Sequence, residues 1–533
     1  MRGWRRSAAS VGALAALAAA LGTSAPTATA APAAAPAATD AADQVNAPIP
    51  TLNWGPCEDD RMVQCATARV PLDYDKPNGA KVTLDLAKIS ASGPGTKLGT
   101  LFVNPGGPGG SSTSAVGYFW SVLGPTVMQR YDVVGIDPRG VGMSAPIACS
   151  TTAPTPPPAP SFPITWAQAK QTWRLAEWIR TACQKDPNRI VGHMSTADTA
   201  RDMDLIRQAV GDAKLNYYGV SYGTYLGATY AAMFKNRVGR FVVDAVLDPV
   251  AWATGDSLPA TQPFSTRLRS AKGAYDSLAS GLAECDRVGT AKCAFAGNSM
   301  AKWKRLVALS KAGDLTFFGD PLPYDALVGG ILGILYAPNY TVLGDVLQML
   351  WDENVGGRAA DAKSRPVDLL ALAESVRRSP YAPSQTRQQV PVGAFEGVAC
   401  SDTRNPSKRL DWWQAGQAQD RQYPWFGSLW TWASSPCARW PISTKADTFF
   451  GKFGGRTATP ILVVGNTYDP ATPYHGAQAF NGLFTNSRLL TNDGWGHGAL
   501  ENDCVTRVWD RYYATGALPA RGTVCQPNEG LYD

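Results

Sequence analysis

Short apolar runs alternate with amphipathic stretches along the first half of the chain. Residues 101–104, 133–137, 215–219 and 241–247 have the length and composition of buried strands, and residues 82–89 alternate apolar with polar as a half-buried strand does. Residues 196–210 carry apolar side chains at helical spacing. Strands that alternate with helices predict an α/β fold with a mostly parallel central sheet, in which ligands bind beyond the carboxyl ends of the strands.

This pattern stops between residues 265 and 443, where no central strand is evident. Helical segments are expected at 267–286, 299–312, 327–336, 341–353 and 367–378, and a buried strand returns at 461–465. We therefore expect a core in two parts, 50–264 and 444–533, with 265–443 inserted as a large α-helical cap over the active site. An independent domain is the alternative. Five tryptophans of this insertion line an apolar pocket or belong to its core: Trp412, Trp413, Trp425, Trp430 and Trp432.

A G-x-S-x-G sequence is centred on Ser221. It follows the expected strand at 215–219 and precedes a helical stretch at 224–234, which is the strand, sharp turn and helix of a nucleophile elbow. Glycines flank the serine because the turn is strained and closely packed. The pentapeptide alone arises by chance in a chain with 52 glycines, so its context is what predicts a nucleophile.

The chain has three histidines, and one of them suits a general base. In this class of hydrolase the order is serine, then acid, then histidine. His497 lies in a glycine-rich loop near the C-terminus, whereas His193 and His475 lie outside such a loop. Asp469 follows the strand at 461–465 and is the candidate acid that orients His497. In the competing interpretation, Asp469 only caps the turn before Pro470.

An oxyanion hole requires two backbone N–H groups aimed at the developing charge. Tyr222, directly after the serine, is expected to supply one. The glycine-rich stretch 104–110 follows the strand at 101–104, and we assign the second donor to Gly107. A phosphate-binding loop is the alternative, but no Gly-Lys-Ser/Thr follows these glycines.

These motifs resemble those of known serine peptidases. Residues 104–110 are similar to the H-G-G-P-G loop of proline iminopeptidases, with Pro105 in place of the family's histidine, and residues 135–144 resemble the strand and turn that follow in those enzymes. Residues 468–473 resemble a segment of secreted bacterial tripeptidyl aminopeptidases. The resemblance runs from about residue 50 to the end. It implies the α/β-hydrolase fold, the triad Ser221, Asp469 and His497, and no metal or organic cofactor.

Aminopeptidases must also recognise a charged amino terminus, which calls for a carboxylate from the cap. Glu374, Glu396 and Asp402 are the candidates, and Asp402 with Cys400 resembles a Cys-x-Asp of the aminopeptidase family. In the competing interpretation each is an ordinary surface acid.

Composition narrows the class and the location of the protein. The 533 residues are 45% hydrophobic and 17% charged, as in globular proteins, and the formal net charge is +6. Residues 1–30 have the form of a signal peptide, with Arg2, Arg5 and Arg6 before an apolar stretch. Residues 31–49 are an Ala/Pro-rich leader or propeptide. We expect a secreted, extracellular protein, and no basic run indicates a nucleic-acid or membrane partner.

Ten cysteines in an exported chain predict disulfides rather than a zinc site, because no C-x-x-C occurs and histidines are few. Their spacing suggests that sequence neighbours pair: Cys57 with Cys65, Cys149 with Cys183, Cys285 with Cys293, Cys400 with Cys437, and Cys504 with Cys525.

The sequence thus predicts a secreted serine exopeptidase that releases short peptides, above all tripeptides, from free N-termini through an acyl-enzyme on Ser221. It is expected to act on peptides as a monomer. An esterase or lipase with the same triad is one alternative, and a non-catalytic secreted binding protein on a hydrolase scaffold is another.

Overall fold

A ten-stranded sheet organises the computed structural model, which describes residues 45–57, 62–147, 156–184, 189–256, 261–356, 393–440 and 448–533. The strand order is β1-β2-β3-β5-β4-β6-β7-β10-β11-β12, antiparallel from β1 to β5 and parallel from β5 to β12. The strands are β1 (Gly55–Pro56), β2 (Gln64–Pro71), β3 (Lys81–Ile89), β4 (Gly99–Asn104), β5 (Tyr131–Ile136), β6 (Leu215–Val220), β7 (Val238–Asp244), β10 (Ile461–Tyr468), β11 (Arg488–Trp495) and β12 (Val524–Cys525).

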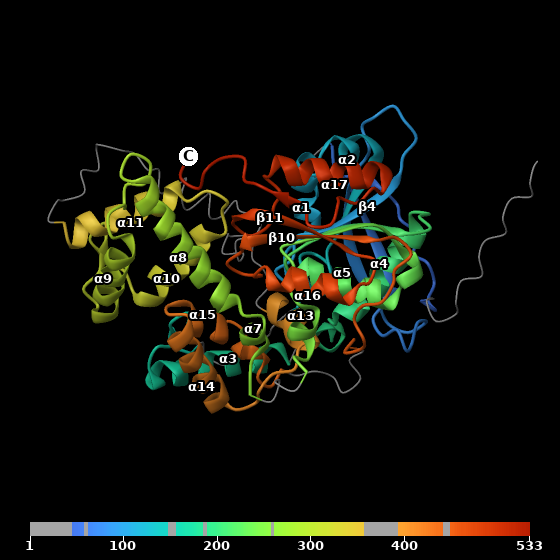
Figure 1. The fold of residues 1–533 in the computed structure, drawn as a ribbon. Helices are drawn as coiled ribbons and strands as arrows, with labels where there is room; N and C mark the ends of the chain where they lie inside the picture. Colours follow the sequence, from blue (N-terminus) through green and yellow to red (C-terminus); the bar gives the residue numbers. More distant parts are fainter. Residues whose placement is uncertain are drawn as a thin grey trace, which may run out of the picture. The chain divides into compact units, whose positions relative to one another are not determined.

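Helices cover both faces of this sheet (Figure 1). Successive strand residues point to opposite faces, so Phe102 of β4 packs in one apolar cluster while Leu101 and Val103 pack in another. The first cluster includes side chains of α4 (Thr196–Ala209), α5 (Tyr222–Met233) and α16 (His475–Leu483). The second includes side chains of α1 (Ser112–Val122), α2 (Pro125–Arg130) and α17 (Asp503–Thr515). The expected α/β fold with a mostly parallel sheet is confirmed.

One predicted strand is displaced along the sequence. The strand expected at 241–247 is β7, Val238–Asp244, and it ends three residues earlier than predicted. Ala245 has a φ of 53°, which takes the chain out of the extended conformation, and its N–H bonds to the Asp244 carboxylate. The apolar run 245–247 is buried in the turn beyond the strand, so its composition resembled a strand although its backbone is not extended.

The segment between β7 and β10 is largely helical and has an apolar core of its own. The helices predicted at 267–286, 299–312, 327–336 and 341–353 correspond to α8 (Ser270–Val288), α9 (Ser299–Ala312), α10 (Tyr324–Leu335) and α11 (Thr341–Asn354), and the one at 367–378 lies outside the described residues. The remaining described elements are α6 (Pro249–Ala253), α7 (Phe264–Arg267), the hairpin β8 (Thr316–Phe317) and β9 (Asp320–Pro321), α13 (Ala394–Asp402), α14 (Arg409–Gln422), α15 (Phe426–Trp432) and the short 3-10 helix η4 (Ser435–Cys437).

The five tryptophans belong to this second core. Trp412, Trp425 and Trp432 are buried in it, and the other two pack against it. Helix α3 (Trp166–Cys183), which comes before the elbow in sequence, also contributes buried side chains to this cluster. The core of the insertion therefore draws on a segment outside the predicted range 265–443.

Four of the five predicted disulfides are present with the predicted pairing: Cys57–Cys65, Cys285–Cys293, Cys400–Cys437 and Cys504–Cys525. Cys183 is also disulfide-bonded, and Cys149, its expected partner, lies outside the described residues. Among the helices that the structure describes, none is both long enough and apolar enough to cross a membrane.

Candidate active site

Ser221 stands at a sharp turn between β6 and α5. Its φ of 57° and ψ of −125° are unusual for a residue with a side chain, and such strain recurs at functional sites. The flanking glycines are required by the lack of space for a side chain. A methyl group at Gly219 would lie 2.5 Å from the Tyr217 ring, and one at Gly223 would lie 2.7 Å from the Asn104 carbonyl oxygen. The local geometry is that of a nucleophile elbow.

The glycine-rich stretch 104–110 packs directly on this elbow. A methyl group at Gly106 would lie 2.4 Å from the Val220 carbonyl oxygen and 3.0 Å from the Tyr222 nitrogen. Gly106 donates its N–H to the Asn104 side chain at 3.0 Å, which closes the turn. Gly107 follows with a φ of 108°, and Tyr222 is the first residue of α5. The first N–H groups of a helix have no partner inside the helix, so Tyr222 can donate to a substrate oxygen.

Asp469 and His497 form a buried hydrogen-bonded pair. The imidazole Nδ1 lies 2.9 Å and 3.0 Å from the two carboxylate oxygens of Asp469, and neither residue is more than 3% exposed. The same carboxylate accepts hydrogen bonds from the N–H groups of Ala471 and Thr472 and from the Thr472 hydroxyl. A carboxylate held by these three donors keeps its orientation, which fixes the imidazole in turn.

Three hydrogen bonds hold the backbone of the loop that carries His497. The Asn466 amide donates to the carbonyl oxygens of Gly496 and Gly498, at 2.9 and 2.6 Å. The backbone N–H of His497 donates to the carbonyl oxygen of Tyr336. The Tyr336 ring also packs against the imidazole in a T-shaped arrangement, with ring centroids 4.8 Å apart. These anchors were not expected from the sequence. Asn466 had a local signal, because it stands between a buried strand and the candidate acid, whereas Tyr336 lies in the remote insertion.

Asp244 connects the elbow to the histidine loop. Its backbone carbonyl accepts the Ser221 N–H at 3.1 Å, and its carboxylate accepts the Ala499 N–H at 2.9 Å. The Tyr218 hydroxyl also donates to it. Burial raises the pKa of Asp244 to about 6, and the nearby charge of Asp469 acts in the same direction. Ser221 and His497 are thus brought to one edge of the sheet, where the carboxyl ends of β6, β7, β10 and β11 meet.

The candidate acids for an amino terminus lie in different surroundings. Asp402 is fully buried and accepts hydrogen bonds from the N–H and hydroxyl of Thr196, and burial raises its pKa to about 7. Thr196 also shares a hydrogen bond with the Tyr222 hydroxyl. Asp402 is therefore linked through Thr196 to Tyr222, the residue that follows the nucleophile. Glu374 lies outside the described residues.

Glu396 is half-buried in the first turn of α13, and this turn lies against the glycine-rich stretch. A methyl group at Gly109 would lie 3.2 Å from the Phe395 nitrogen. Burial raises the pKa of Glu396, and the only described interaction that opposes this rise is a hydrogen bond from its own N–H. Glu396 therefore belongs to a turn that packs on the glycine-rich stretch, and burial disfavours the charged form of its carboxyl group.

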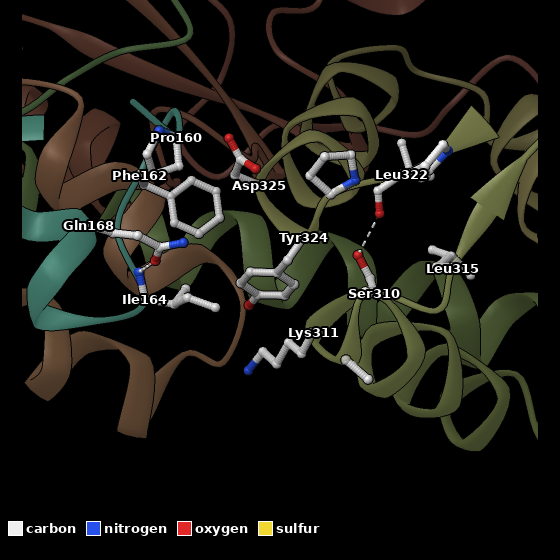
Figure 2. A pocket seen from close by; sticks show the side chains of 14 residues that line it. Pro160, Phe162, Ile164, Gln168, Ser310, Lys311, Leu315, Leu322, Tyr324 and Asp325 are labelled. Carbon is white, nitrogen blue, oxygen red and sulfur yellow. Dashed lines mark hydrogen bonds between the residues drawn. The ribbon is translucent and has the colours of Figure 1, made fainter. Parts of the chain in front are cut away.

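A cavity of about 340 Å³ lies elsewhere in the chain. It is formed by residues 160–168 together with the end of α9, the β8–β9 hairpin and the start of α10, and Phe162, Tyr324, Lys311 and Asp325 line it (Figure 2). None of the predicted site residues belongs to its lining. Among the described residues, no group of three or more His, Cys, Asp or Glu side chains is arranged to hold a metal ion.

Two family models match parts of the chain that contain the candidate site residues. The family model described as "alpha/beta hydrolase fold" matches residues 99–267, which contain the elbow, and the model described as "TAP-like protein" matches residues 423–525, which contain Asp469 and His497. Among solved structures, a hydrolase from Pseudomonas aeruginosa aligns over 87% of this chain and 98% of its own at 13% identity and a TM-score of 0.30.

Curated relatives match almost the whole chain. A tripeptidyl aminopeptidase of Streptomyces coelicolor is 31% identical over 90% of this chain and 86% of its own. The serine protease Hip1 of Mycobacterium tuberculosis is 30% identical over 89% and 91% of the two chains, and a protein named carboxylesterase B from the same species is 31% identical over 91% and 92%. The chain therefore belongs to the tripeptidyl aminopeptidase family of the α/β-hydrolases, and it is a serine hydrolase.

Proposed function

We propose that this chain is a secreted serine exopeptidase that removes short peptides, in particular tripeptides, from free N-termini, with Ser221, Asp469 and His497 as its triad. The observation that carries the proposal is the buried Asp469–His497 pair, whose loop is tied through Asp244 to the elbow of Ser221. Relatives named tripeptidyl aminopeptidase, at 31% identity, support the substrate class.

The proposed chemistry follows from the roles of these groups. Ser221 attacks the scissile carbonyl while His497 takes the hydroxyl proton, and Asp469 stabilises the imidazolium that forms. The N–H groups of Gly107 and Tyr222 hold the developing oxyanion. His497 then protonates the leaving amine, and a water molecule hydrolyses the acyl-enzyme with His497 again acting as base.

Glu396 is the acid that we assign to the substrate's amino terminus. Its support is the contact between α13 and the glycine-rich stretch, and the rise in its pKa through burial. An ammonium group beside this carboxylate favours its charged form and offsets the cost of burial. Asp402 is less suited, because Thr196 already occupies its oxygens. Glu374 remains an untested candidate.

Secretion is part of the proposal. Its support is the signal-peptide pattern of residues 1–30, and the presence of four disulfides, which persist in oxidising compartments. Finding the protein, processed near residue 30, in the medium of its source culture is the expected result. Retention of the full chain inside the cells would contradict this part.

The test of substrate recognition compares a free-amine tripeptide anilide with its N-acetylated twin. Loss of a charge-assisted hydrogen bond costs about 1.5–3 kcal/mol, so E396Q should lower kcat/KM for the free-amine substrate by about 10- to 100-fold and leave the blocked substrate unchanged. The control is E284Q, which removes an acid of α8 that is paired with Arg287. Equal losses of kcat/KM on both substrates would show that Glu396 does not recognise the amino terminus. Activity in S221A would show that the assigned triad is wrong.

An esterase remains the second candidate, because a relative named carboxylesterase B is as similar to this chain as the aminopeptidases are. The same triad serves both reactions. Rapid hydrolysis of a short-chain nitrophenyl ester with no cleavage of the tripeptide anilide would favour this candidate.

A further inference from the structure

One face of α8 lies against the segment that carries Asp469. Ser270 donates its hydroxyl to the Ala471 carbonyl oxygen at 2.6 Å, and Ser277 donates to the Tyr468 carbonyl oxygen at 2.9 Å. The acid segment is therefore hydrogen-bonded to the helix both before and after Asp469.

Between these two serines, Gly273 of α8 packs against the backbone of Asp469. A methyl group at Gly273 would lie 2.5 Å from the Asp469 carbonyl oxygen and 2.6 Å from the Pro473 ring. The Asp469 backbone could make room for such a methyl group only by shifting, and this would move the Asp469 carboxylate with it. Glycine at 273 is thus what permits the observed approach, despite its lower helix propensity.

The same face also reaches the strand that leads to the histidine. Trp495, two residues before His497, donates its indole N–H to the Ser280 hydroxyl at 2.7 Å. Positions 270, 273, 277 and 280 repeat at intervals of three and four, so they form one continuous stripe of the helix. Every member of this stripe contacts the acid segment or the end of β11.

We propose that α8 is a positioning element for the acid–base pair, in which Ser270, Gly273, Ser277 and Ser280 set the place of Asp469 relative to His497. The inference rests on the proposed function, because it takes Asp469 as the acid that orients His497. Helix α8 then serves catalysis through Asp469 and need not itself touch the substrate. A displacement of about 1 Å in such a group lowers the rate by about 100-fold.

The helix itself supplies a matched control. Gly281 is a second glycine of α8, and the nearest atoms to a methyl group there would belong to the buried Tyr340 ring, at 2.7 Å, and to Tyr532, not to the backbone of the acid segment. G273A and G281A therefore introduce similar crowding in one helix. We expect G273A to lower kcat by about 10- to 100-fold with KM within about twofold of wild type, and G281A to keep kcat within about threefold at a comparable fall in Tm. Equal losses of kcat in the two variants would overturn the proposal.

A double-mutant cycle tests whether Gly273 acts through Asp469. In a D469N background, G273A should cause no further loss of kcat beyond about twofold, because the group that it displaces no longer functions. A loss that multiplies with that of D469N would mean that Gly273 affects the protein by another route, and would contradict the inference.

A milder pair keeps the test valid if G273A does not fold. S277A removes a hydroxyl-to-carbonyl bond of 2.9 Å to the acid segment, and S310A removes one of the same length, from α9 to Leu322. S277A should lower kcat about threefold or more with KM unchanged, whereas S310A should not. Equal kcat values in S277A and S310A would overturn the proposal.

Failure of the proposed function is distinguishable from failure of this inference. All variants are assayed on the free-amine tripeptide anilide and on a nitrophenyl acetate ester. If only the ester is cleaved, the substrate class is wrong, but the comparison of G273A with G281A still decides the role of α8. If S221A and D469N keep full activity on both substrates, the triad is wrong and the inference falls with it.

Discussion

Asn466 holds the backbone on both sides of His497, and replacing its amide by a carboxyl group reverses that interaction. The buried amide donates to the Gly496 and Gly498 carbonyl oxygens, and its own oxygen accepts from Asn492 at 2.9 Å. In N466D, an ionised carboxylate would place an oxygen against two carbonyl oxygens. The protonated form would still donate one hydrogen bond. We therefore expect the new carboxyl group to stay neutral in the folded protein.

The penalty of N466D then depends on pH in a calculable way. The lost hydrogen bond costs about 1 kcal/mol at any pH. Keeping an Asp neutral in the folded state, when its unfolded pKa is about 3.9, costs about 4 kcal/mol at pH 7 and about 1.5 kcal/mol at pH 5. Because the folded pKa is the higher one, stability is lost as the pH rises above the unfolded value. The total penalty is about 5 kcal/mol at pH 7 and about 2.5 kcal/mol at pH 5.

Urea unfolding at pH 5 and pH 7, followed by tryptophan fluorescence, measures this difference. The control is N466L, which removes the same donors but cannot titrate, so its penalty should be equal at the two pH values. A penalty for N466D that is also the same at both pH values would refute the reasoning, because it would mean that an ionised group is accommodated where two carbonyls are said to converge.

Three further predictions concern buried groups outside the triad. Burial raises the pKa of Asp244 to about 6, so the protein gains stability as the pH falls from 7 to 4 and this carboxyl group is protonated; D244N removes that gain and should destabilise the protein more at pH 4.5 than at pH 7.5, by about 2 kcal/mol in urea unfolding. Arg267 donates to five backbone carbonyl oxygens, and R267M should lower the free energy of unfolding by about 4 kcal/mol, with a ΔTm under about 3 °C counting against this role. Cys504 and Cys525 staple α17 to β12, and their joint replacement by alanine should cost about 3 kcal/mol in the same assay.

The parts of the site that were predictable from sequence are those set by local chemistry. The G-x-S-x-G pattern marks the elbow, because methyl groups at Gly219 and Gly223 would collide with Tyr217 of the same strand and with Asn104 of its neighbour. The acid and base could be placed because each follows a buried strand, and carboxyl ends of parallel strands meet at one edge. The alternation of apolar and polar residues at 82–89 likewise predicted β3, in which Val82, Leu84 and Leu86 are buried while Thr83 and Asp85 are more exposed.

The supports of the site were not predictable, because they join residues far apart in the chain. Nothing local to Tyr336 marks it as the acceptor of the His497 N–H. The serines of α8 read as ordinary helix positions until the acid segment is seen beside them. Asp402 carried a family-like motif, yet its oxygens are used by Thr196. Partners of this kind depend on tertiary packing, which overrides local pattern.

The most direct test of the central claim is the ratio of kcat/KM for a free-amine tripeptide anilide to that for its N-acetylated twin, measured on the secreted protein and on S221A. We expect a ratio of about 100 or more, because the N-acetylated substrate loses a charge-assisted contact and must bury its blocking group, and we expect no detectable cleavage by S221A. A ratio near one, or cleavage that survives in S221A, would contradict a serine exopeptidase.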